Sequence, residues 1–255
     1  MKFDLWSDYH VEMNPAFAWD KFQPESKVLI LAGDTANHAL KTLDVLEMAC
    51  SKYEKVGFIT GNHDYYSTNY IDQTDKMLFE NCPENAFFLD NSPLYHEDTI
   101  FLGEMGWYSW DYPGVGDIAL QAERWMSHMN DSRFIRFYDK LPRDLAEDAS
   151  KRIAARLKEL KSTVYPKTVV ITHTVPNINA MVPRHHDWSP LNGSYYNSFM
   201  QNVWKDDAIK PNVWCFGHTH FPYDFVENNV RFVCNPRGYY GESTPGKRGP
   251  VTIEV

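Results

Sequence analysis

Short apolar runs that end in polar, ligand-type motifs are the feature that most constrains how this chain can fold. Five such runs are followed directly by aspartate, asparagine or histidine. The motifs are Asp8-Tyr9-His10, Gly33-Asp34, Gly61-Asn62-His63-Asp64, Thr172-His173 and Gly217-His218-Thr219-His220. Because ligands collect at the carboxyl ends of strands in α/β sheets, five such loops at one sheet edge would bring these side chains together.

Strand-like runs alternate with helical stretches along most of the chain, which predicts an α/β fold. The apolar runs expected as strands are residues 1–6, 27–32, 56–59, 87–89, 99–102, 168–172, 212–216, 221–226, 231–234 and 251–255. Apolar side chains at helical spacing predict helices over residues 35–52 and 145–160. Because we find no internal repeat and no Gly/Ser-rich linker, we expect a single domain spanning residues 1–255.

Residues from about 106 to 140 break this alternation. Their periodicity is poor and their aromatic content is high, so we predict a cap insertion packed over one edge of the core. Trp107, Tyr108 and Trp110 can be interpreted in two ways. They can stack against a nucleobase or another flat group, or they can form the small core of the cap itself.

Charge and composition exclude several classes of partner. The net charge of −9 and the absence of a Lys/Arg run argue against binding to long duplex nucleic acid. The spacing of the four cysteines matches no metal-binding motif. Cysteines that stay as free thiols are typical of the reducing environment of the cytoplasm. The start of the chain lacks the apolar region of a signal peptide. No apolar stretch approaches the roughly 18 residues of a membrane span. We therefore expect a cytoplasmic protein without membrane contact.

The polar motifs have the composition of a metal site. In an extended segment residues i and i+2 point the same way, so Asp8 and His10 can face one site, as can His218 and His220. Carboxylate oxygen and imidazole nitrogen suit Mn²⁺, Fe²⁺/Fe³⁺ or Zn²⁺ better than Ca²⁺. The ligands are too many for one ion. They suit two divalent metal ions that share a bridging carboxylate and act together on a phosphoryl group.

Taken together and in this order, the motifs resemble those of the calcineurin-like metallophosphoesterase superfamily, in particular its small bacterial and phage-type phosphoesterases. The resemblance extends from residue 8 to residue 220. It implies a β-sandwich of two mixed sheets flanked by helices, an α-β-β-α arrangement. It also implies two ligand sets that share Asp34. The first set is Asp8, His10, Asp34 and His220, and the second is Asp34, Asn62, His173 and His218.

The same resemblance implies a reaction and two further roles. A metal-bridging hydroxide would attack the phosphorus of a phosphoester. His63 would contact the phosphate and protonate the leaving group, and Asp64 would orient His63. The expected activity is that of a phosphodiesterase or phosphatase on a small phosphorylated metabolite or nucleotide.

The sequence departs from the Ser/Thr protein phosphatase branch. That branch carries an arginine in an extended Gly-Asp motif, whereas this chain reads Gly33-Asp34-Thr35-Ala36-Asn37, so we do not expect protein phosphatase activity. Substrate contacts are expected instead from the polar loop around residues 184–188, from the stretch 235–239 and from the cap. The residues proposed for this role are Arg184, His185, Arg237 and Trp107.

Two other functions stay open at this stage. A nuclease on short or single-stranded nucleic acid is one, because the opening Ser7-Asp8-x-His10 also occurs in repair nucleases of the superfamily. A metal-stabilised scaffold without catalysis is the other. Any one motif alone is more simply explained as a turn or a buried histidine, so the metal-site prediction depends on all five occurring together.

Overall fold

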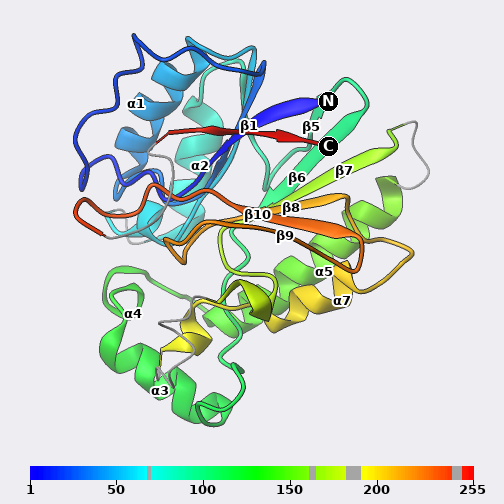
Figure 1. Ribbon diagram of the computed structural model, residues 1–255. Helices are drawn as coiled ribbons and strands as arrows, with labels where there is room; N and C mark the ends of the chain where they lie inside the picture. The colour runs from blue at the N-terminus through cyan, green and yellow to red at the C-terminus, as the bar shows by residue number, and fades with distance from the viewer. Residues whose placement is uncertain (68–69, 161–164, 182–190, 243–248) are drawn as a thin grey trace.

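The fold is built on two mixed β-sheets that pack face to face (Figure 1). The computed structural model describes residues 1–67, 70–160, 165–181, 191–242 and 249–255. The five-stranded sheet has the order β11-β1-β2-β3-β4 and the six-stranded sheet has the order β5-β6-β7-β8-β10-β9. The predicted β-sandwich is therefore confirmed.

The first sheet is parallel except at one edge. Its strands are β1 (Lys2–Trp6), β2 (Val28–Ala32), β3 (Lys55–Ile59), β4 (Ala86–Phe88) and β11 (Val251–Glu254). Strands β1 to β4 pair in parallel, and β11 pairs antiparallel with β1 in a register that places Phe3 opposite Ile253. The carboxyl ends of β1, β2 and β3 therefore lie at one edge of this sheet.

The second sheet combines a parallel centre with antiparallel edges. Its strands are β5 (Leu94–His96), β6 (Thr99–Glu104), β7 (Lys167–Thr172), β8 (Val213–Phe216), β9 (Tyr223–Glu227) and β10 (Val230–Cys234). Strands β6, β7, β8 and β10 run parallel, whereas β5 and β9 pair antiparallel at the two edges. Because β7 and β8 are parallel, the predicted ligand motifs that follow them, with His173 and His218, start from the same edge of this sheet.

Period-two alternation in the strands explains why helices cover both outer faces. In β2, Val28, Ile30 and Ala32 point between the sheets, while Leu29 and Leu31 point toward the helices. Helices α1 (Ala39–Cys50) and α2 (Ile71–Asn81) cover the first sheet, and α5 (Pro142–Leu160) and α7 (Gln201–Trp204) cover the second. Strands β2 and β8 are buried along their whole length, which explains why they are continuously apolar.

Two helix predictions need adjustment. The helix expected over residues 35–52 begins only at Ala39, because His38 adopts an extended conformation and its side chain accepts a hydrogen bond from the Leu40 amide. Residues 35–37 are left in the loop after β2, where they take part in the site. Helix α2 and strand β5 were not predicted. The helix expected over residues 145–160 is confirmed as α5.

Between β6 and α5 the chain forms α3 (Ile118–His128) and α4 (Asp131–Phe134), which lie apart from both sheets in Figure 1. A separate hydrophobic cluster holds this segment together. It consists of Tyr65, Met105, Trp107, Tyr108, Trp110, Trp125, Ile135 and Ala146. We propose that residues 106–140 form a cap on a single domain. Among the described residues, no helix is long and apolar enough to cross a membrane.

Packing of α5 on the second sheet yields a stability prediction. Leu157 is 1% exposed and belongs to the cluster between α5 and the sheet. We expect Leu157→Ala to lower the free energy of unfolding by about 2–5 kcal/mol, because it leaves a cavity. The neighbouring exposed Lys158→Ala should stay within roughly 0.5 kcal/mol of the wild type. Urea denaturation measures both, and equal losses would contradict this account of the core.

Candidate metal centre

The loops after five strands bring the seven predicted ligands to one place. Asp8 and His10 follow β1, Asp34 follows β2 and Asn62 follows β3. From the second sheet, His173 follows β7, and His218 and His220 follow β8. All but Asn62 belong to two groups of side chains whose ligand atoms lie within 4.8 Å of one another, and both groups include Asp34. Asn62 lines the same cavity as Asp34 and His218.

The first group comprises Asp8, His10, Asp34 and His220, all buried. The Nε2 atom of His10 lies 3.6 Å from Oδ2 of Asp34 and 3.1 Å from Nε2 of His220. The Nε2 atom of His220 lies 3.4 Å from Oδ1 of Asp8. Two carboxylates and two imidazoles facing one point form a donor set that fits a divalent transition metal ion.

The second group comprises Asp34, His173 and His218, also buried. The Nε2 atom of His173 lies 3.2 Å from Oδ2 of Asp34. Neither this nitrogen nor the buried Oδ1 atom of Asn62 has a hydrogen-bond partner within the described chain. Because a buried polar atom without a partner is costly, these two orphaned acceptors fit a bound cation.

Outer hydrogen bonds fix the orientation of three histidine rings. Nδ1 of His173 lies 2.9 Å from the Ala32 carbonyl oxygen, and Nε2 of His218 lies 3.0 Å from that of Ser194. Nδ1 of His220 lies 2.8 Å from the carboxylate of Glu242. A ring nitrogen facing an acceptor carries the proton, so the other nitrogen of each ring is free to bind a metal.

Backbone strain is concentrated at the same residues. Asp8, His10, Asp34, His218 and His220 all have positive φ angles, between 43° and 70°. Residues other than glycine rarely adopt this conformation, because it costs free energy. Such strained residues are typically found at functional sites. Gly61 serves the same geometry, because a Cβ atom there would collide with the Asp34 carboxylate.

Charges are strongly coupled within the centre. Although burial opposes ionisation, His173 and His63 hold the pKa of Asp34 well below its usual value. Burial likewise disfavours a charged His173, but the Asp34 carboxylate raises the pKa of this histidine to about 9, so a metal ion that binds Nε2 would displace a proton. Burial, and then the charge of His173, lower the pKa of His218 to about 3. The carboxylate shared by the two groups is thus ionised, as a metal ligand must be.

His63 lies beside the two groups and lines the cavity, but its partners differ from those predicted. Its Nδ1 atom lies 2.7 Å from Oδ1 of Asn37, and its Nε2 atom lies 3.0 Å from the hydroxyl of Tyr239. Asp64 instead accepts hydrogen bonds from the Gly61 amide at 2.8 Å and the Thr42 hydroxyl at 2.8 Å. The prediction that Asp64 orients His63 was therefore wrong, because its carboxylate is used to hold the surrounding loops.

Of the four residues predicted to contact substrate, the two that the structure describes do not line the cavity. Trp107 is 4% exposed and stacks on Tyr65 within the core of the cap, so the prediction that it meets substrate is corrected. Arg237 donates to the Pro15 carbonyl oxygen and lies 4.7 Å from the ring centre of Tyr9, away from the cavity lining. Arg184 and His185 fall outside the described residues.

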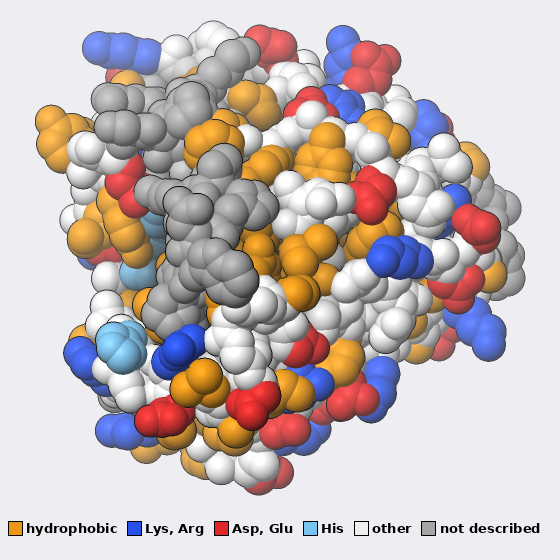
Figure 2. All heavy atoms as spheres, turned by 60° about the horizontal axis from the view of Figure 1, so that its bottom comes forward, with side chains coloured by type: hydrophobic (Ala, Val, Ile, Leu, Met, Phe, Trp, Pro, Cys, Tyr) orange, Lys and Arg blue, Asp and Glu red, His pale blue; other side chains and the backbone are white. Residues whose placement is uncertain are grey.

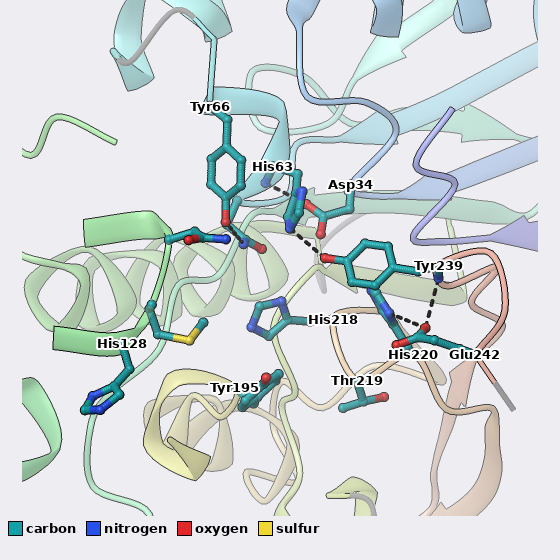
Figure 3. Close-up of a pocket in the computed structure, with 13 residues that line it drawn as sticks. Asp34, His63, Tyr66, His128, Tyr195, His218, Thr219, His220, Tyr239 and Glu242 are labelled. Carbon is teal, nitrogen blue, oxygen red and sulfur yellow. Dashed lines mark hydrogen bonds and ion pairs between the residues drawn. The ribbon is translucent and has the colours of Figure 1, made fainter. Parts of the chain in front are cut away.

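A cavity of about 440 Å³ opens over the centre (Figure 3). Its lining includes Asp34, Asn62, His63, Tyr66, His128, Met129, Asn130, Tyr195, His218, Thr219, His220, Tyr239 and Glu242. Sequence reasoning missed Tyr66, Tyr195 and Glu242, and also Asn37 behind His63. Asn37 carried a usable signal, since it lies a few residues after the Gly33-Asp34 motif, and Tyr239 stands within the stretch 235–239 from which substrate contacts were expected.

Comparison with known proteins gives a consistent result. The family model for calcineurin-like phosphoesterases matches residues 1–222. An uncharacterised protein of Acanthamoeba polyphaga mimivirus is 25% identical over 264 residues, covering 92% of this chain and 90% of that protein.

Two solved structures share the fold. The phosphopantetheinyl hydrolase of Mycobacterium tuberculosis superposes with a TM-score of 0.74 at 17% identity, covering 93% of this chain and 89% of the hydrolase. A candidate 5′-nucleotidase from Staphylococcus aureus gives a TM-score of 0.51 at 13% identity. The superposition covers 100% of this chain and 51% of the 5′-nucleotidase chain.

The centre predicts that metal ions stabilise the protein. A Mn²⁺ concentration about 100-fold above the dissociation constant should add roughly 2.7 kcal/mol to the free energy of unfolding. Asp34→Asn should remove most of this gain, because Asp34 belongs to both groups. The exposed Asp139→Ala should retain the full gain. Thermal unfolding with and without Mn²⁺ measures the effect, and an equal gain in both variants would contradict the assignment.

Proposed function

The chain belongs to the calcineurin-like phosphoesterase family, and we propose that it is a dinuclear metal-dependent hydrolase of small phosphoesters. The observation that carries the proposal is the shared Asp34, whose carboxylate belongs to both buried ligand groups. A phosphodiesterase or phosphatase acting on a small phosphorylated metabolite or nucleotide fits this arrangement.

The proposed ligands are divided between the two ions as the family resemblance implies. Asp8, His10, Asp34 and His220 would hold one ion, and Asp34, Asn62, His173 and His218 would hold the other. When bound, two divalent ions such as Mn²⁺ supply positive charge to the phosphoryl oxygens and activate a water molecule. The chain itself contributes the fixed, ionised carboxylate and histidine rings that are already oriented by their outer hydrogen bonds.

His63 is the proposed proton donor to the leaving oxygen. The side-chain carbonyl oxygen of Asn37 faces Nδ1, so this nitrogen carries a proton, and Nε2 is directed toward Tyr239 in the cavity. In the imidazolium form Nε2 carries the second proton, and this is the proton that would pass to the leaving oxygen. The backbone amide of His63 also donates to Oδ1 of Asp34 at 2.8 Å. This bond fixes the position of His63 relative to the proposed bridging carboxylate, which is what a general acid needs.

The volume of the cavity and the charge of the chain support a small substrate. A cavity of about 440 Å³ suits a small molecule. On the face shown in Figure 2, Lys and Arg side chains lie scattered among Asp and Glu and do not gather into one continuous patch. The chain carries a net charge of −9, so long nucleic acid is disfavoured as a partner. The two structures that share the fold are named for hydrolysis of phosphopantetheinyl and nucleotide compounds.

Model substrates test the activity directly. We expect the Mn²⁺-loaded protein to hydrolyse p-nitrophenyl phosphate or bis-p-nitrophenyl phosphate, to lose turnover on chelation and to regain it when Mn²⁺ is restored. Preference for the diester would indicate a phosphodiesterase, and preference for the monoester a phosphatase. If the protein binds two Mn²⁺ ions and yet turns over neither compound nor any phosphorylated metabolite in a screen, the scaffold function replaces this proposal.

Removing His63 should separate catalysis from metal binding. We expect His63→Ala to lower kcat about 10²–10⁴-fold, because proton transfer to the leaving group is lost. Metal stoichiometry should be unchanged, since His63 is not among the proposed ligands. His96→Ala, in β5 and remote from the cavity, serves as the matched control and should leave kcat unchanged. A kcat of His63→Ala within a few-fold of wild type would contradict the role of His63.

A further inference from the structure

We propose that Asp131, contributed by the cap, is a positioning residue that fixes the amide of Asn62 with its Oδ1 atom directed to the proposed second metal ion. The inference rests on the proposed function and extends it, because it makes a segment outside the sandwich part of the metal centre. Asp131 begins α4 and is separated from Asn62 by 69 positions in the chain.

The contact is short and fully buried. Nδ2 of Asn62 donates to Oδ1 of Asp131 at 2.9 Å. Asp131 is 0% exposed and Asn62 is 2% exposed. A buried hydrogen bond to a carboxylate oxygen is costly to break, because it would leave a buried acceptor with one donor fewer.

Carboxylate chemistry determines which way the amide faces. Both oxygens of the Asp131 carboxylate already accept a hydroxyl hydrogen, Oδ1 from Tyr66 and Oδ2 from Tyr108, so the NH₂ group of Asn62, and not its carbonyl oxygen, faces Asp131. The carbonyl oxygen Oδ1 must then point the other way. This is the buried oxygen that has no hydrogen-bond partner among the described residues, and Asn62 lines the cavity together with Asp34 and His218. A flipped amide would direct its NH₂ group at the cation, and an amide NH₂ group does not coordinate a metal ion.

Asp131 is itself held in place by two tyrosine hydroxyls, one from the loop after β3 and one from the cap. Its Oδ1 atom also accepts from the Tyr66 hydroxyl at 2.5 Å, and its Oδ2 atom accepts from the Tyr108 hydroxyl at 2.9 Å. The indole of Trp125 donates in turn to Tyr108. Tyr108 and Trp125 belong to the aromatic cluster of the cap, so the cap core fixes the carboxylate that orients Asn62. One function of the aromatic-rich insertion is therefore to complete the second ligand group.

Mn²⁺ binding to the full-length protein tests the inference without relying on activity. Isothermal titration and the spin coupling of paired Mn²⁺ ions in electron paramagnetic resonance report the two sites separately. In Asp131→Asn, whose amide allows either orientation of Asn62, we expect the second ion to bind about 10–100-fold more weakly and the first to bind as in the wild type. Asp131→Ser, which introduces no bulk, should give the same selective loss and covers the case in which Asp131→Asn does not fold.

The matched control is Asp139→Asn. It makes the same chemical change in the same cap but at an exposed side chain, so both Mn²⁺ ions should bind with near-wild-type affinity. Adding Asp131→Asn to an Asn62→Ala background should cause no further loss, because Asp131 acts through Asn62.

The outcomes separate the two levels of the proposal. Two tightly bound ions in both folded Asp131 variants would overturn this inference and leave the proposed function standing. Loss of both ions together in the Asp131 variants would reduce Asp131 to a structural role and also overturn it. A wild-type protein that binds fewer than two ions would overturn the proposed function and this inference with it.

Discussion

The carboxylate of Asp34 is the group on which the rest of the site depends. Its Oδ2 atom lies 3.6 Å from Nε2 of His10 and 3.2 Å from Nε2 of His173, so it stands between the two ligand groups. Its Oδ1 atom accepts the backbone amide of His63. One buried side chain thus connects both proposed metal positions with the proposed proton donor. Burial of such a charge is costly without compensation, and a pair of cations would supply it.

The position of Asp34 explains why the sandwich must form before the centre exists. Asp8, His10, Asp34 and Asn62 extend from the first sheet, and His173, His218 and His220 extend from the second. Neither sheet alone carries a complete group. The hydrophobic cluster between the sheets, from Phe3 and Ile30 to Ile171 and Cys215, holds the two strand edges in register. In the proposed centre, the cap adds a third contribution through Asp131, so residues from three parts of the fold converge on one cavity.

Local pattern made much of this predictable. Continuous apolar runs marked the buried strands β2 and β8, and the carboxyl ends of parallel strands bring the polar motifs that follow them to one edge of the sheet. Contacts between distant segments were beyond that reasoning. Asp64 lies next to His63 in sequence, yet Asn37 holds the ring, because the fold turns Asp64 toward Thr42 and Gly61. No pattern in the sequence pairs Asn62 with Asp131. Burial likewise decided Trp107, whose residue type fitted a substrate platform and a core equally well.

A crystal structure of the Mn²⁺-loaded protein, with anomalous differences measured at the manganese edge, tests the central claim most directly. The account predicts two anomalous peaks about 3.5–4 Å apart, with the Asp34 carboxylate between them. One peak should contact Asp8, His10 and His220, and the other should contact Asn62, His173 and His218. A single fully occupied peak, or two peaks that Asp34 does not bridge, would contradict it.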